Sequence, residues 1–88
     1  MLGLLYIYKL NKEMKEINVQ ISNRIRELRA RFQWTQQDLA SKVGVTRQTI
    51  AALEKGDYVP SLLLAMNICL EFQMAVEEVF QLKRGGQQ

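Results

Sequence analysis

Few residues of this 88-residue chain could carry out acid–base, nucleophilic or metal chemistry. There is no histidine, which excludes a histidine-based triad, a histidine zinc ligand and an imidazole proton shuttle. Cys69 is the only cysteine, so an internal disulfide and a cysteine-rich metal site are excluded, and a reducing, cytoplasmic location is the simplest interpretation. No site with paired titratable groups emerges, and we therefore expect neither an enzyme nor a bound cofactor.

The charged residues are segregated along the chain, and this pattern indicates a different kind of chemistry. Residues 22–56 contain seven basic and three acidic side chains, a net charge of +4, whereas residues 57–82 contain four acidic side chains and no basic one. A concentrated basic block is the electrostatic pattern expected of a protein that binds a polyanion. From charge alone, a basic face that is simply solvated remains the alternative.

Helices are the elements that must position these charges, because the chain has one proline and long stretches of good helix formers. We expect an all-α domain over residues 22–82, with an N-terminal extension at 1–21 and a frayed tail at 83–88. The spacing of apolar residues predicts five helices. The first begins at Ser22, and its apolar stripe is Ile21, Ile25, Leu28 and Phe32. The other four are expected at Gln36 to Val43, after Thr46 to about Lys55, at about Leu62 to Phe72 and at about Val76 to Leu82.

The joint between the second and third predicted helices leaves almost no loop. Thr35 begins the second helix as a cap, with Asp38 three residues on, and Gly44 ends it in the left-handed conformation. Ala40 allows the two helices to cross closely, and Val45 and Ile50 fill the wedge between them. This arrangement leaves the first turn of the third helix exposed on a convex face, where a recognition helix reaches the edges of DNA bases.

The first 21 residues allow two interpretations. Residues 1–10 are apolar but too short for a membrane span, and they lack the basic start and cleavage site of a signal peptide. Residues 16–21 alternate in polarity, so a strand there could pair with a strand in residues 1–10 through a loose hairpin. Alternatively, Met14 is the true start of the protein.

The segment Thr35-Gln-Gln-Asp-Leu-Ala-Ser-Lys-Val-Gly-Val-Thr-Arg-Gln-Thr-Ile-Ala-Ala-Leu-Glu-Lys-Gly56 resembles the signature of lambda-repressor-like, Cro-type helix-turn-helix regulators of the xenobiotic-response-element family. Tyr58, Pro60, Ser61 and the ending Val76-Glu-Glu-Val-Phe80 are similar to those of the compact single-domain members. The resemblance spans about residues 22–82. It implies a five-helix domain that binds double-stranded DNA, usually as a homodimer on a pseudo-palindromic operator.

The resemblance also implies roles for individual residues. Arg47 and Gln48 are the expected base readers, because arginine suits guanine and glutamine suits adenine. The residues expected near the bases are Thr46, Arg47, Gln48, Thr49, Ala51 and Ala52. Those expected at phosphates are Gln36, Gln37, Lys55 and Tyr58. Since Ala51 and Ala52 lack polar atoms, we expect modest sequence specificity.

In relatives, an arginine of the first helix pairs with a glutamate near the end of the third, which implies a structural ion pair between Arg29 and Glu54. Other positions depart from the family pattern. Gln73 stands where relatives have a helix-ending glycine, and Ala75 replaces the usual serine cap of the fifth helix. Trp34 replaces an aliphatic residue, and we expect it in the core.

The fourth helix carries leucines where relatives have polar residues. Leu63 and Leu70 are seven residues apart and share one face. We expect this face to be covered by a second subunit or by the N-terminal segment. Its predicted residues are Leu63, Asn67, Leu70 and Met74.

Two other classes of function stay open. One is an antitoxin-type protein whose main partner is another polypeptide, and the other is a helical adaptor that has kept the fold without binding DNA. The sequence does not favour a membrane or a small-molecule ligand as the partner. It leaves open the operator and whether binding represses or activates transcription.

Overall fold

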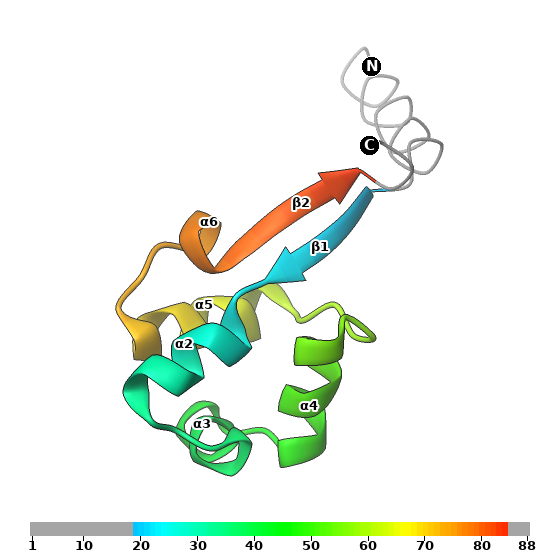
Figure 1. Cartoon of the computed structure of the whole chain (residues 1–88). Coiled ribbons are helices and arrows are strands. Elements are labelled where there is room, and N and C mark those ends of the chain that lie inside the picture. Colours follow the sequence, from blue (N-terminus) through cyan, green and yellow to red (C-terminus); the bar gives the residue numbers. More distant parts are fainter. Residues whose placement is uncertain (1–18, 85–88) are drawn as a thin grey trace, which may run out of the picture.

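The computed structural model describes residues 19–84, which form helices joined to a two-stranded ribbon (Figure 1). In chain order the elements are β1 (Val19–Asn23), α2 (Ile25–Phe32), α3 (Gln36–Val43), α4 (Arg47–Lys55), α5 (Leu62–Phe72), α6 (Val76–Val79) and β2 (Phe80–Arg84). The expected five-helix, lambda-repressor-like architecture is confirmed for this part of the chain. None of its helices is both long enough and apolar enough to cross a membrane.

The three central helices begin and end at the residues that the sequence predicts. The Thr35 hydroxyl accepts a hydrogen bond from the Asp38 amide, and the Asp38 carboxylate accepts one from the Thr35 amide, so α3 begins with a capping box. The hydroxyls of Thr46 and Ser61 each accept a hydrogen bond from the backbone amide three residues on and so cap α4 and α5. Gly44 and Gly56 end α3 and α4 with φ angles of 75° and 84°, which favour glycine.

The core lies between helices α2 to α6 and contains only apolar side chains. Cys69 is buried there, in keeping with its expected packing role, and burial raises the pKa of its thiol. Trp34 packs against the core and stacks on both Phe32 and Phe72, at ring centroid distances of 4.7 and 5.5 Å, and the two phenylalanine rings also contact each other. The largest fully buried side chains are Ile25, Leu28, Leu39, Ile50, Leu53, Ile68 and Val79.

The first and last elements pair with each other, which the sequence analysis did not predict. β1 and β2 run antiparallel in a two-stranded ribbon, with Val19 opposite Arg84 and Asn23 opposite Phe80. The Arg24 amide extends this pairing by donating a hydrogen bond to the Val79 carbonyl, at 2.9 Å. The ribbon projects from the helical body (Figure 1).

The prediction that the fifth helix continues to Leu82 is therefore wrong. α6 ends at Val79, and Phe80 adopts extended φ and ψ angles of −119° and 137°. The backbone groups of residues 80–84 hydrogen-bond to β1 instead of continuing the helix. This pairing supplies the partners that backbone N–H and C=O groups need. Lys83 and Arg84, which were assigned to the tail, belong to this strand.

The first helix and the N-terminal strand also differ in detail from expectation. α2 begins at Ile25 rather than Ser22, and Ile21 lies in β1 rather than on the helical stripe. Asn23 explains the change of backbone, because its side chain accepts a hydrogen bond from the Ile25 amide and donates one to the Leu53 carbonyl. The hairpin expected with residues 1–10 lies outside the described residues.

Candidate nucleic-acid interface

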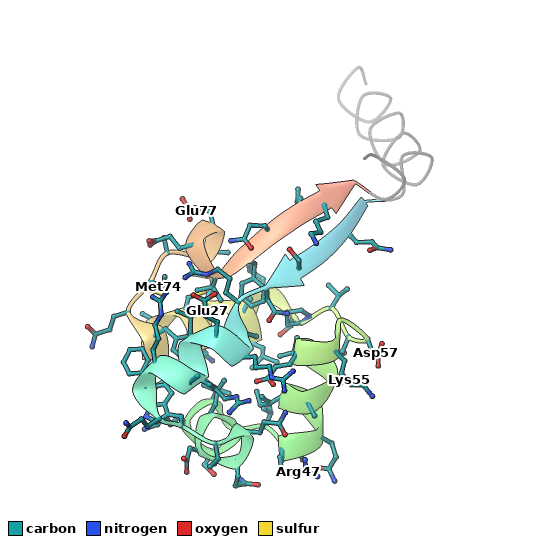
Figure 2. All side chains as sticks on the ribbon, in the orientation of Figure 1. Glu27, Arg47, Lys55, Asp57, Met74 and Glu77 are labelled. Atoms are coloured by element: carbon teal, nitrogen blue, oxygen red, sulfur yellow. The ribbon has the colours of Figure 1, made fainter. Side chains whose placement is uncertain are left out.

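The turn between α3 and α4 sets the position of the α4 N-terminus. Gly44 takes the left-handed conformation, and the Val45 amide donates a hydrogen bond to the Ala40 carbonyl at 3.0 Å. Ala40 is fully buried at the helix crossing, and Val45 packs against the core. The chain therefore turns within three residues and α4 begins at once, with Arg47 at its free end (Figure 2).

The residues expected to read bases form the outer side of α4. Thr46, Arg47 and Gln48 are exposed, whereas Thr49, Ala51 and Ala52 are half-buried. Ile50 and Leu53 point inward and are essentially inaccessible to solvent. The Thr46 and Thr49 hydroxyls lie 3.1 Å apart and hydrogen-bond to each other. Arg47 and Gln48 therefore carry most of the free hydrogen-bonding capacity at this end of the helix.

The structure brings Arg29 and Glu54 together in a two-point ion pair. The Arg29 Nε and Nη2 atoms donate to the two carboxylate oxygens at 2.6 and 3.1 Å. The Arg29 Nη1 atom donates to the Trp34 carbonyl at 2.8 Å. Their side chains are only 15% and 6% exposed, so the pair fixes α2 to α4 in a largely desolvated position.

Gln36 connects this ion pair to Arg47. Its Nε2 atom donates to Glu54 Oε1 at 3.1 Å, and its Oε1 atom accepts a longer hydrogen bond from Arg47 Nη1 at 3.4 Å. Because a carboxylate only accepts hydrogen bonds, Glu54 fixes the orientation of the Gln36 amide and turns its oxygen towards Arg47. From the sequence, Gln36 is expected at a phosphate, and its link to Arg47 is not predicted, because the link depends on how α3 packs on α4.

The electrostatic surroundings of Glu54 favour its ionised form. Burial acts against the charge, but hydrogen bonds from Arg29 and Gln36, together with the charges of Arg29 and Arg26, outweigh it. The pKa of Glu54 is therefore lower than its ordinary value, while the hydrogen bond to Glu54 and the charge of Glu54 raise the pKa of Arg29. Near neutral pH the two groups are fully charged and neutralise each other.

The other residues expected at phosphates lie at the two ends of this surface. Gln37 is exposed in the first turn of α3 and donates to the Ser41 hydroxyl at 3.0 Å. Lys55 and Tyr58 are exposed at and just beyond the end of α4, and Asp57 lies near Lys55 (Figure 2). The amides of the first α3 turn lie beside Gln36, where unpaired helical N–H groups favour an anion.

The apolar face of α5 is more extensive than the sequence analysis predicts. Leu63 and Leu70 are 71% and 72% exposed, and Asn67 is half-buried. Met74 lies beyond the helix and packs against the core, so it is not a free member of this face. Leu62 and Met66 were missed, although both are exposed. α5 carries apolar residues on both its inner and its outer side, so the sequence does not separate the two faces.

Comparison with known proteins identifies the family once this geometry is in place. The family model described as "Helix-turn-helix" (HTH_3) matches residues 25–79, from the start of α2 to the end of α6. The chain belongs to this helix-turn-helix family. It is a family of DNA-binding transcriptional regulators and not of enzymes.

Relatives from bacteria and archaea share most of the domain. An uncharacterised HTH-type transcriptional regulator of Bacillus subtilis, YgzD, is 60% identical over 63 residues, which is 72% of this chain and 96% of the relative. An uncharacterised HTH-type transcriptional regulator of Methanocaldococcus jannaschii, MJ0272, is 48% identical over 60 residues, 68% of this chain and 91% of the relative.

A solved structure shares the fold. The restriction-modification controller protein C.AhdI of Aeromonas hydrophila is similar with a TM-score of 0.59 and 27% identity. The similarity covers 62% of this chain and 83% of the controller protein. The residues matched by the family model include both α3 and α4.

Proposed function

We propose that this helix-turn-helix protein regulates transcription in the cytoplasm by inserting α4 into the major groove of a specific operator. The observation that carries the proposal is the free end of α4, where Arg47 (Figure 2) and Gln48 are exposed directly after the turn at Gly44. Arginine and glutamine can each form paired hydrogen bonds with a purine, and Thr49 and Ala51 offer methyl groups to thymine. Gln36, Gln37, Lys55 and Tyr58 would hold the DNA backbone on either side.

We further propose that the active form is a homodimer on a pseudo-palindromic site. One nine-residue helix buries little surface in the groove, so a single copy would bind weakly. Leu62, Leu63, Met66 and Leu70 form an exposed apolar face that a second copy would cover. Two copies related by a two-fold axis would place their α4 helices about 34 Å apart, one turn of the duplex.

Selection of random duplexes on the purified protein tests the proposal. We expect recovery of a two-fold-related consensus sequence whose half-sites are about one helical turn apart. The double variant Arg47→Ala/Gln48→Ala should lose this consensus, while Lys83→Gln, a change on β2, should keep it. Recovery of the same consensus by the Arg47→Ala/Gln48→Ala protein would refute the role of α4.

A polypeptide partner is the second candidate function, and the α5 face favours it. Leucines at more than 70% exposure would equally suit an antitoxin-type protein that covers them with another chain. In that case we expect the purified protein to remain monomeric, and a different polypeptide to co-purify with it in a fixed ratio. An adaptor without DNA binding would give no enrichment in the duplex selection.

A further inference from the structure

A hollow beside the recognition helix contains charged residues that neither the ion pair nor the base readers use. It occupies about 270 Å³ between α2, α3 and α4. At about 30 Å³ for each water molecule, this space can hold a small anion with part of its hydration shell. Its lining residues are Arg26, Arg29, Gln36, Ala51, Glu54 and Lys55.

The charge of the hollow is positive once its internal pairing is counted. Glu54 is the only acidic lining residue, and Arg29 neutralises it through two hydrogen bonds. Arg26 and Lys55 are exposed, and neither forms a salt bridge or a side-chain hydrogen bond within residues 19–84. Two positive charges therefore face the hollow without a protein partner in this part of the chain.

The position of the hollow relative to α4 indicates which anion it takes. Ala51 and Lys55 lie one and two turns along α4 from Arg47, and Gln36 begins α3 on the other wall. A duplex whose major groove holds the start of α4 carries its sugar–phosphate backbone along the sides of that helix. Phosphate groups are the anions that this placement brings to the hollow.

We propose that the hollow is a seat for one phosphate group of the DNA backbone, with Arg26 of α2 and Lys55 of α4 as its two cationic ligands. The proposal rests on the proposed function and extends it, because it adds α2 to the DNA interface. Of the two cations, Lys55 is expected at a phosphate from the sequence, as is Gln36 on the other wall. Arg26 is not, because the sequence does not show that its side chain shares a hollow with α4.

The salt dependence of binding to a mixed-sequence duplex tests the proposal without knowledge of the operator. The slope of log affinity against log salt changes by about 0.9 for each phosphate contact. If Arg26 and Lys55 share one phosphate, the double variant Arg26→Gln/Lys55→Gln should lower the slope by about 0.9 per protomer, whereas Lys55→Gln alone should lower it by less, because Arg26 still neutralises that phosphate. An equal loss for Lys55→Gln alone would overturn the role of Arg26. The variant Arg26→Lys/Lys55→Arg, which keeps both charges, should retain the original slope.

A control variant removes the same net charge elsewhere on the described surface. Arg31 pairs with exposed Glu27, and Lys83 lies on β2, so Arg31→Gln/Lys83→Gln should leave the slope unchanged. The proposal would be overturned if this variant, the Arg26→Gln/Lys55→Gln variant and the unmodified protein all had equal slopes. It would also be overturned if the Arg26→Gln/Lys55→Gln variant lowered the slope by about 1.8, because that loss indicates two separate phosphates. If the unmodified protein itself fails to bind the duplex, the proposed function fails, and the phosphate seat fails with it.

Discussion

Glu54 connects three helices through its side-chain hydrogen bonds. Its carboxylate accepts two hydrogen bonds from Arg29 of α2 and one from Gln36 of α3, while its own backbone belongs to α4. Since Gln36 also contacts Arg47, the orientation of an expected base reader is linked to a buried ion pair. The ion pair was expected from the family resemblance, but the link through Gln36 was not. Side-chain contacts of this kind follow from tertiary packing and leave no spacing signal in the sequence.

The first prediction concerns the removal of one partner from this pair. Arg29→Met should lower the free energy of unfolding by roughly 3 kcal/mol, because it leaves the nearly buried Glu54 carboxylate without its main partner. The measurement is chemical denaturation of the purified protein near neutral pH.

The matched control is an arginine of the same helix in an exposed pair. Arg31 and Glu27 are 61% and 49% exposed, so Arg31→Met should cost less than about 1 kcal/mol. Similar losses for the two variants would show that burial of the Arg29–Glu54 pair does not determine its contribution.

At the scale of single elements, the sequence predicts the helices that have chemical signals at both ends. α3 has the Thr35 cap and Gly44, α4 has Thr46 and Gly56, and their observed bounds agree with the prediction. The end of α6 has no such signal. Residues 76–82 carry apolar side chains at a spacing that suits both a helix and a strand, and pairing with a distant strand decides between them.

The second prediction concerns the two helices, α2 and α5, that end at a left-handed residue other than glycine. Gln33 and Gln73 take φ angles of 59° and 57°, a region that is unfavourable for residues with a Cβ atom. Gln33→Gly and Gln73→Gly should each stabilise the protein by about 0.5–1 kcal/mol, measured as an increase in the denaturation midpoint at constant m-value.

The same substitution inside a helix provides the comparison for this prediction. Gln37 lies in the first turn of α3 with helical backbone, so Gln37→Gly should destabilise the protein by about 1 kcal/mol. Destabilisation in all three variants would mean that the left-handed conformation imposes no measurable strain at positions 33 and 73.

At the scale of the whole molecule, the expected DNA-binding side and the exposed apolar face belong to different helices. The proposed DNA contacts lie on α2, α3 and α4, whereas the leucines lie on α5. The charge follows the same division, since residues 22–56 are basic and residues 57–82 are acidic. This division allows one surface to contact a duplex while the other contacts a second copy.

The third prediction tests that division. Leu63→Glu/Leu70→Glu should convert the proposed dimer to a monomer, because it places two carboxylates in an apolar contact. Sedimentation equilibrium should report the mass of one chain, and affinity for a two-fold-related duplex should fall at least tenfold, about 1.4 kcal/mol.

Val59 offers a control for the third prediction, because it is exposed but lies outside the apolar face of α5. It is 65% exposed and lies in the loop before α5, so Val59→Glu should remain dimeric. A dimer that survives both leucine substitutions would place the subunit contact elsewhere on the molecule.

The β1–β2 ribbon has a consequence for the order in which the molecule is built. Its strands are the first and last described elements, and Val19 pairs with Arg84 across nearly the whole domain. During synthesis a nascent chain emerges from the ribosome N-terminal end first. Strand β1 therefore has no partner until residues 80–84 have been synthesised and have left the ribosome, after the helices that precede them in the chain. We expect the ribbon to close after these helices have formed.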